Sequence, residues 1–385
     1  MKKSLLALAV LGAFAGAASA QSSVTVYGIV DVGVNSTDLG GSGTAGRTIG
    51  LSSGGQSASR FGFKGTEDLG GGLSAIFQLE GGFAADTGSS STNANTLNGL
   101  GGPAASASLF NRISTVGLQG GFGVVNLGRQ TTLLKDAHDQ IDPFGAAGAT
   151  GNLERIFYDG LNPSGGRVSN SVKYTSPSFS GFKASASYVF GETADNTGAN
   201  RQYGLGLGYT NGPLNVQFGY NDADIFGATG STIPGTTVGN QGTEVKVAFL
   251  GAVYNFGVLK LHGAYADSKF EEPTGGSDSV RNAMIGVSVP FGAGTLLASY
   301  ATNDVKNSSN EDSKQLAIGY TYDLSKRTNL YTGYARTSND SGASLGGANN
   351  AGFTGVGTTA ATLNPTNVIS GNDVSVFNVG VRHKF

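Results

Sequence analysis

The chain has no cysteine and no tryptophan among its 385 residues. The missing cysteine excludes disulfides, thiol chemistry and cysteine-ligated metal sites. After the first 20 residues, no stretch approaches the ~18 apolar residues of a membrane-spanning helix. Charged residues make up 13% of the chain, about half of the share usual in soluble domains. The composition therefore fits neither a helical membrane protein nor an ordinary soluble one.

Glycine is abundant, with 64 residues, and its share is far above the usual ~7%. Disorder would explain the glycine but not the regular alternation of apolar and polar residues described below. The first 20 residues have a different pattern. Lys2 and Lys3 precede an apolar run from Leu5 to Ala15, and Ala18-Ser19-Ala20 is a small-x-small cleavage site. We predict a cleaved signal peptide over 1–20 and one domain over 21–385, since the apolar run is too short to span a membrane.

Period-2 alternation of apolar and polar residues dominates the rest of the chain. Segments of about ten residues begin near positions 23, 58, 72, 109, 121, 167, 180, 201, 213, 242, 258, 280, 294, 312, 328 and 372. The parity of those near 109, 121 and 328 is ambiguous. The connections alternate between long and short, and the longest include 36–57, 84–108, 131–166 and 337–371. An even-stranded barrel with both termini at one end produces this pattern.

The last segment shows why the barrel must close. Phe377, Val379, Val381 and Phe385 share one parity, with His383 interrupting the row. In a soluble protein such a strand would be an aggregation-prone edge. Lipid on its apolar face and pairing with the strand over 24–34 would resolve both problems.

Several motifs in order resemble the trimeric general porins of Gram-negative outer membranes, betaproteobacterial type. They are Ser23-Val-Thr-Val-Tyr-Gly-Ile-Val-Asp31, Ser59-Arg-Phe-Gly-Phe-Lys-Gly-Thr-Glu-Asp-Leu-Gly70, Asn111-Arg112 with Val116-Gly-Leu118, Phe122-Gly123 with Leu127-Gly-Arg129, Asn170-Ser-Val-Lys-Tyr174 with Ser176-Pro177, Tyr322-Asp-Leu-Ser-Lys-Arg-Thr328 and Val379-Gly-Val-Arg-His-Lys-Phe385. The resemblance implies an all-β, sixteen-stranded antiparallel transmembrane β-barrel with short periplasmic turns, long extracellular loops and an inward-folded third loop. It also implies a homotrimer, and a terminal Phe385 that the outer-membrane assembly machinery reads.

Basic residues lie mainly on predicted strands, among them Lys173, Lys183, Lys246, Arg336 and Arg382. Lysine or arginine on the lipid face at mid-depth costs ~2–4 kcal/mol, so we expect these bases to face the lumen. By resemblance, Arg60, Lys64, Arg112 and Arg129 form the basic wall of the pore constriction. The acids Asp136, Asp139, Asp142 and Glu154 lie in the loop over 131–166, which the resemblance folds into the barrel.

Facing acids and bases would create a transverse field that favours polar solutes. We therefore expect a water-filled channel for passive diffusion of small hydrophilic solutes, with a weak preference for anions. The expected partners are outer-membrane lipid and lipopolysaccharide, with divalent cations bridging acidic outer loops to its phosphates. No other cofactor and no nucleic acid is expected.

Two other classes stay open on the sequence. An outer-membrane enzyme needs a nucleophile and base, and no paired serine and histidine is apparent. An adhesin or surface-structural barrel would use its long loops for binding. The Gly41–Gly46 and Gly50–Gly54 matches to nucleotide-binding and hydrolase motifs lack the strand-turn-helix context that would support them. His138, His262 and His383 have no metal-ligand spacing.

Overall fold

The computed structural model describes residues 23–40, 46–90, 108–145, 148, 150–157, 166–225, 232–233, 236–237, 243–271, 275–306, 311–343 and 371–385. The signal peptide predicted over 1–20 lies outside these residues. No helix in the described part of the chain is long and apolar enough to cross a membrane.

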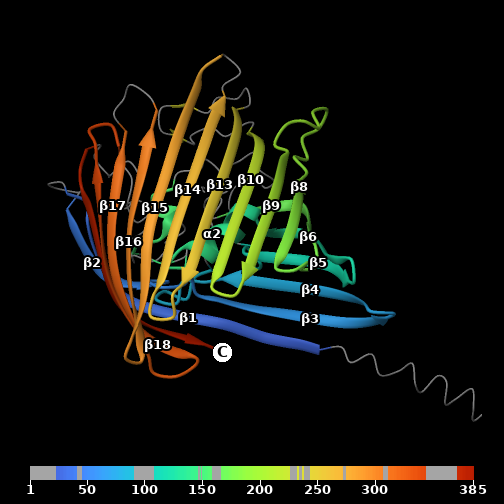
Figure 1. The fold of residues 1–385 in the computed structure, drawn as a ribbon, viewed down its shortest axis with the longest axis horizontal. Helices are drawn as coiled ribbons and strands as arrows, with labels where there is room; N and C mark the ends of the chain where they lie inside the picture. Colours follow the sequence, from blue (N-terminus) through green and yellow to red (C-terminus); the bar gives the residue numbers. More distant parts are fainter. Residues whose placement is uncertain are drawn as a thin grey trace, which may run out of the picture.

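One antiparallel sheet closes on itself, as Figure 1 shows. Its strands are β1 (Ser23–Asp38), β2 (Arg47–Ser53), β3 (Arg60–Gly70), β4 (Leu73–Gly82), β5 (Ile113–Gly120), β6 (Gly123–Thr131), β7 (Arg167–Thr175), β8 (Phe182–Val189), β9 (Gln202–Asn211), β10 (Leu214–Ile225), β13 (Thr243–Asn255), β14 (Lys260–Glu271), β15 (Ser277–Phe291), β16 (Gly294–Val305), β17 (Ser313–Asp323), β18 (Thr328–Asn339) and β19 (Val374–Lys384). The strands β11 (Thr232–Ile233) and β12 (Thr236–Thr237) form a separate small hairpin.

Two strands, β2 and β3, together occupy the one position in the barrel next to β1. Val32–Asp38 of β1 pairs with β2, and Ser23–Ile29 of β1 pairs with β3. The sheet therefore has sixteen positions, which confirms the predicted strand number. The sequence-based boundary of the first loop was wrong, because 36–57 was expected to be all loop. The strand β2 lies within this range and exposes Ile49 and Leu51 on the outer face. Residues 54–59 form an inner bend between β2 and β3.

The barrel closes between its first and last strands. Ile29–Asp38 pairs with Ser375–Lys384, and Gly28 and Phe385 exchange two backbone hydrogen bonds of 3.1 Å. Phe377, Val379 and Val381 are exposed on the outer face, whereas Asn378 is buried on the inner one. The predicted pairing and faces of the last strand are thus confirmed. His383 lies on the outer row and hydrogen-bonds the Thr328 hydroxyl at 2.9 Å.

The two ends of the barrel differ in their connections. Ser23, which is the first described residue, Phe385 and the short turns, such as Gly70–Leu73 and Asn211–Leu214, lie at one end, which we name the short-turn end. The strand ends that lead into the long connections lie at the other, the long-loop end. The exposed apolar residues occupy the outer rows of the strands between these ends, where a bilayer would cover them.

Some bases that were expected in the lumen lie outside. Lys246 and Arg336 occupy outer rows, next to Asp222 on β10 and Leu316 on β17 in the strand register. Lys246 contacts Glu244 at 2.8 Å, and Arg336 contacts Asp373 at 2.7 Å. The expectation failed because it treated every strand residue as lying at mid-depth, whereas these strands continue toward the long-loop end.

Candidate functional site

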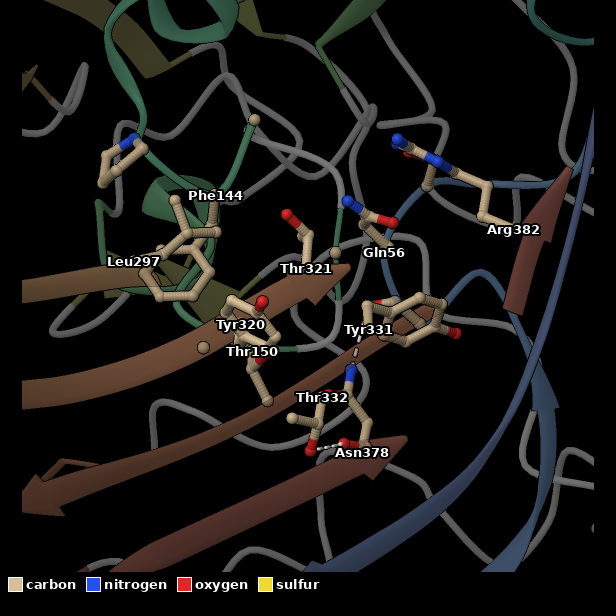
Figure 2. A pocket seen from close by; sticks show the side chains of 16 residues that line it. Gln56, Phe144, Thr150, Leu297, Tyr320, Thr321, Tyr331, Thr332, Asn378 and Arg382 are labelled. Carbon is tan, nitrogen blue, oxygen red and sulfur yellow. Dashed lines mark hydrogen bonds between the residues drawn. The ribbon is translucent and has the colours of Figure 1, made fainter. Parts of the chain in front are cut away.

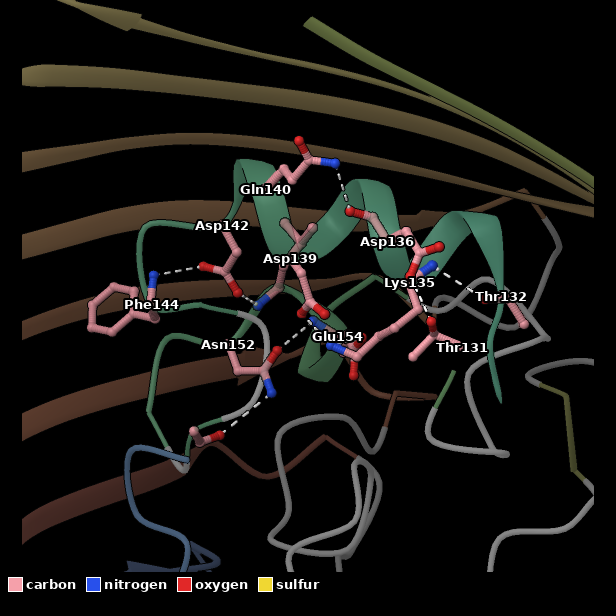
Figure 3. Close-up of polar contacts among 12 residues, drawn as sticks. Thr131, Thr132, Lys135, Asp136, Asp139, Gln140, Asp142, Phe144, Asn152 and Glu154 are labelled. Carbon is pink, nitrogen blue, oxygen red and sulfur yellow. Dashed lines mark hydrogen bonds and ion pairs between the residues drawn. The ribbon is translucent and has the colours of Figure 1, made fainter. Parts of the chain in front are cut away.

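The connection between β6 and β7, here named the internal loop, enters the barrel. It begins with helix α2 (Leu133–Ile141), which Figure 1 shows inside the barrel. The Thr132 hydroxyl caps this helix by accepting a hydrogen bond of 3.1 Å from the Lys135 N–H. After α2, the Asp142 carboxylate accepts hydrogen bonds from the Phe144 and Leu153 N–H groups, at 2.8 and 2.7 Å. These bonds fold the loop back into the short helix η2 (Leu153–Arg155), as Figure 3 shows.

An apolar contact holds the internal loop against one side of the inner wall. Leu134, Ile141 and Phe157 pack with Val247 and Phe249 of β13, and each is at most 2% exposed. The cluster continues over the inner faces of β10 and β14–β16. The internal loop therefore fills this side of the lumen at the level of the cluster.

Two histidines take part in this attachment. His138 of α2 packs with its ring centroid 4.5 Å from that of Phe249 and 6.2 Å from that of Phe157. Burial, with a smaller contribution from the Lys135 cation, lowers the pKa of His138 to about 3. His262 of β14 contacts the Ile141 carbonyl through Nδ1 at 2.7 Å and the Ser288 hydroxyl through Nε2 at 3.0 Å. Both histidines thus serve the seating of the loop.

The opposite wall carries arginines around one carboxylate. Glu80 of β4 contacts Arg112 Nε at 2.6 Å and Arg60 Nη1 at 3.9 Å. Its second oxygen accepts a hydrogen bond of 3.0 Å from the Tyr27 hydroxyl. Arg60 begins β3, and Arg112 directly precedes β5. Two guanidinium groups therefore share a single carboxylate, which leaves positive charge in excess.

Two more arginines lie beside this pair. Arg129 lies at a β-bulge in β6, and it donates to the Asn111 carbonyl at 2.6 Å and the Ser169 hydroxyl at 3.0 Å. Its partners in the described part of the chain are neutral. Arg167, the first residue of β7, interacts electrostatically with Arg112 and Arg60. Arg167 was not predicted from the sequence. Its position at the end of the internal loop, opposite Thr131 in the strand register, would have indicated a place on the wall once the barrel topology was assumed.

Lys64, the remaining predicted base, is exposed on β3. Its ammonium lies 5.5 Å from the centroid of the Tyr27 ring, a cation–π arrangement. It therefore lies near the Arg60–Glu80 group but makes no ion pair within the described residues.

The predicted acids of the internal loop have different partners. Asp136 contacts Lys173 of β7 at 2.8 Å and accepts a hydrogen bond of 2.6 Å from the Thr131 hydroxyl. Asp139 and Glu154 both contact Lys135 within the loop itself, the latter at 3.0 Å. Burial raises the pKa of Glu154, although the Lys135 cation opposes this. Asp142, as described above, binds backbone N–H groups.

A second segment also enters the lumen. The inner bend is held by Asp31 of β1, whose carboxylate accepts bonds from the Gln56 and Ser57 N–H groups at 3.0 and 2.6 Å. The Tyr331 hydroxyl donates to the same carboxylate at 2.6 Å. Asp31 is fully buried. This bend was not predicted from the sequence, because a Gly/Ser-rich stretch is typical of an outer loop.

The described residues contain no group of three or more histidine, aspartate or glutamate side chains that could hold a metal ion.

A profile of the family described as Gram-negative porin matches residues 7–343. The chain belongs to this family. Outer membrane porin protein 32 of Delftia acidovorans is 37% identical over 394 residues, covering 100% of both chains. An outer membrane porin protein of Bordetella pertussis is 35% identical, over 86% of this chain and 93% of the relative.

Solved structures agree with this membership. The anion-selective porin from Comamonas acidovorans superimposes with a TM-score of 0.77 at 33% identity, covering 95% of this chain and 100% of that chain. The predicted family and barrel are therefore confirmed. This porin is a channel of the outer membrane through which small solutes diffuse passively, and it is not an enzyme.

Proposed function

We propose that this porin prefers anions, and that the preference arises where the basic wall faces the internal loop. The basic wall comprises Arg60, Lys64, Arg112 and Arg129, together with Arg167. The observation that carries the proposal is the sharing of Glu80 between Arg112 and Arg60, at 2.6 and 3.9 Å. A cationic constriction lowers the entry barrier for anions and raises it for cations.

The acids of the internal loop make this preference weak. Asp139 and Glu154 share the single cation of Lys135, and Asp136 contacts Lys173. These pairs oppose the arginines across the passage without cancelling them. The resulting transverse field orients polar solutes and disfavours apolar ones, which cannot replace the ordered water. The name of the Comamonas acidovorans structure, an anion-selective porin, supports the same proposal.

The reversal potential in a salt gradient tests the proposal. The porin should show a preference for chloride over potassium, and the double substitution Arg60→Gln and Arg129→Gln should shift the reversal potential toward that of a cation-preferring pore. Arg336→Gln, which removes an arginine from the outer face, is the matched control and should leave it unchanged. A wild-type preference for potassium would refute the proposal.

The porin is further proposed to act as a homotrimer. The outer rows of β4 and β5 are uncharged, with Phe77, Val116 and Leu118 exposed, whereas outer rows from β10 onward carry paired charges. An uncharged face suits contact with neighbouring protomers. Chemical cross-linking in detergent should give a trimer as the largest product. A monomer at all cross-linker concentrations would contradict the proposed homotrimer.

The charged outer rows suit contact with lipopolysaccharide. Glu244 and Glu271 lie directly opposite each other in the strand register, and Lys246 approaches them at 2.8 and 3.7 Å. A divalent cation shared with lipid phosphates would relieve the repulsion between the two carboxylates. Chelation should then release lipopolysaccharide that copurifies with the porin, and full retention would count against the bridge.

Phe385 is proposed as the signal for the assembly machinery. Its side chain is 46% exposed on the outer face although its backbone is paired with Gly28. Phe385→Ala should reduce the amount of porin inserted in cells more than its folding in detergent. Equal losses in both would assign the residue to packing alone.

A further inference from the structure

Strands that the internal loop covers carry glycine on their inner rows. These glycines include Gly206 of β9, Gly219 of β10, Gly251 of β13, Gly286 of β15, Gly319 of β17 and Gly333 of β18. The backbone does not require glycine at these positions, because none of them has a positive φ or lies at a shift of the strand register. Glycine inside a strand weakens it and often marks a place that another group approaches closely. At these positions that group is the internal loop.

Two of these glycines face rigid side chains of the loop. An added Cβ on Gly251 would lie 2.7 Å from Cγ1 of Ile141 and 2.9 Å from its Cγ2. An added Cβ on Gly286 would lie 2.8 Å from Cγ of Pro143. Carbon atoms in contact are ~3.5–4.0 Å apart, so either Cβ would overlap with the loop. Neither neighbour can swing aside, because Ile141 is β-branched and fully buried and the side chain of Pro143 is a ring.

The loop meets the wall and the inner bend again farther along the chain. Thr150 lies on Gly333 of β18, where an added Cβ would approach the Cβ of Thr150 to 3.2 Å. Gly148 fits against the inner bend, because an added Cβ there would lie 3.1 Å from the Gly55 carbonyl oxygen. Figure 2 shows Thr150 and Gln56 of the inner bend, which line the same cavity of about 250 Å³. Close contacts from β13 to the inner bend thus fix how far the loop stands from the wall.

The other side of α2 faces the basic wall. Asp139 and Gln140 are exposed on this side, and Asp139 interacts electrostatically with Arg60 of β3. A displacement of α2 away from β13 therefore moves the helix toward Arg60 and narrows the lumen between them. At Gly251 the displacement would be roughly 1 Å, because the contact of 2.7 Å must lengthen to that of an ordinary pair of carbon atoms.

We propose that Gly251 and Gly286 are positioning residues that set the largest size of solute the porin passes. They act through Ile141 and Pro143, since a wall without side chains at these two points lets the loop lie deeper against the strands. The diameter of a pore contributes to deciding which hydrophilic solutes cross it. The inference is independent of the proposed anion preference, because the width of the lumen limits neutral solutes as well as charged ones.

Swelling of liposomes that contain the porin tests the inference, with the neutral sugars arabinose and glucose as probes. Glucose is the larger of the two, so the ratio of the glucose rate to the arabinose rate reports the width of the lumen. The ratio also cancels the amount of porin inserted. Gly251→Ala and Gly286→Ala should each lower this ratio, because the loop moves away from the wall that carries the new methyl group. An unchanged or higher ratio in both variants would overturn the inference.

Gly206→Ala is the matched control, because it adds the same methyl group beneath α2 at an ordinary contact distance, 3.7 Å from the Cβ of Leu133. It should leave the ratio unchanged. Ile141→Ala combined with Gly251→Ala removes both carbon atoms that the new Cβ meets, and it should return the ratio toward the wild-type value. A double variant that keeps the low ratio, or an equal fall with Gly206→Ala, would overturn the inference. If Gly251→Ala does not assemble, the comparison of Gly286→Ala with Gly206→Ala provides the same test.

Discussion

Acidification should loosen the internal loop through His138. This residue is 2% exposed, and its Nε2 has no hydrogen-bond partner in the described part of the chain. Protonation would place a charge between Phe249 and Phe157, with the Lys135 cation nearby. The loop can escape this cost by detaching from the wall, because a detached His138 is solvated and free to bind a proton.

The magnitude follows from the two pKa values of His138. The pKa is about 3 when the loop is attached and about 6.5 when it is solvated. Since the attached value is the lower one, attachment is strongest above pH ~6.5 and weakens as the pH falls toward ~3. Between pH 7.5 and pH 5, the population of the detached loop should rise roughly 30-fold, which corresponds to about 2 kcal/mol.

Glu154 acts in the opposite direction. Burial raises the pKa of Glu154, so its contribution to attachment is present below the ordinary pKa and is lost as the pH rises through the raised value. A variant that lacks His138 must therefore be compared with the wild type. His138→Leu removes the histidine but keeps Glu154 and the apolar contact.

Thiol labelling measures the detached population. The chain has no cysteine, so Ala137→Cys places a single reporter on the buried face of α2, and Gln140→Cys places a reference on its exposed face. The ratio of the two labelling rates cancels the pH dependence of the reagent. Relative to the His138→Leu background, this ratio should rise roughly 30-fold between pH 7.5 and pH 5 with His138 present. In the His138→Leu background itself, the ratio should stay level or fall. The same rise in both backgrounds would refute the reasoning.

Two further predictions concern the seating of the internal loop. Phe157→Ala should raise labelling of the Ala137→Cys reporter at every pH, because truncating a buried phenylalanine costs ~3–5 kcal/mol, and an unchanged rate would show that the cluster with Phe249 does not hold the loop. His262→Leu should increase current noise in single channels, because the Ile141 carbonyl would lose its bond of 2.7 Å, and wild-type noise would mean that the apolar contact alone fixes this end of the helix.

The alternation along the chain predicted the strands but not always their faces. In β13, Val245, Val247 and Phe249 alternate with Glu244 and Lys246. A lipid-facing interpretation of such an apolar row is natural, yet these three residues are fully buried beneath the internal loop. The row is apolar because the inner wall there contacts a protein segment rather than water. The alternation in a sequence indicates a strand, but it does not show whether lipid or another part of the protein covers the apolar face.

The candidate site was predicted in part for a similar reason. Arg60 and Arg112 lie on strands or directly beside them, so their motifs place them near the wall. The positions of Arg167 and Arg382 follow from closure of the barrel, which brings distant strands together. The partners of the acids depend on how α2 is oriented in the lumen: Asp139 points toward Lys135, whereas Asp142 caps the helix that it follows. Such orientations result from packing against β10–β16.

The seam between Gly28 and Phe385 also bears on how the barrel forms. Its two partners come from opposite ends of the described chain, so the first strand has no neighbour on this side until the last strand has been made. Pairings between residues so distant in sequence are slow to form, because loop-closure entropy must be lost first. An added Cβ on Gly28 would lie 2.3 Å from the Phe385 ring and 2.7 Å from the Arg60 carbonyl. The final step of folding therefore brings together two strands that were made first and last, at a seam with no room for a side chain on Gly28.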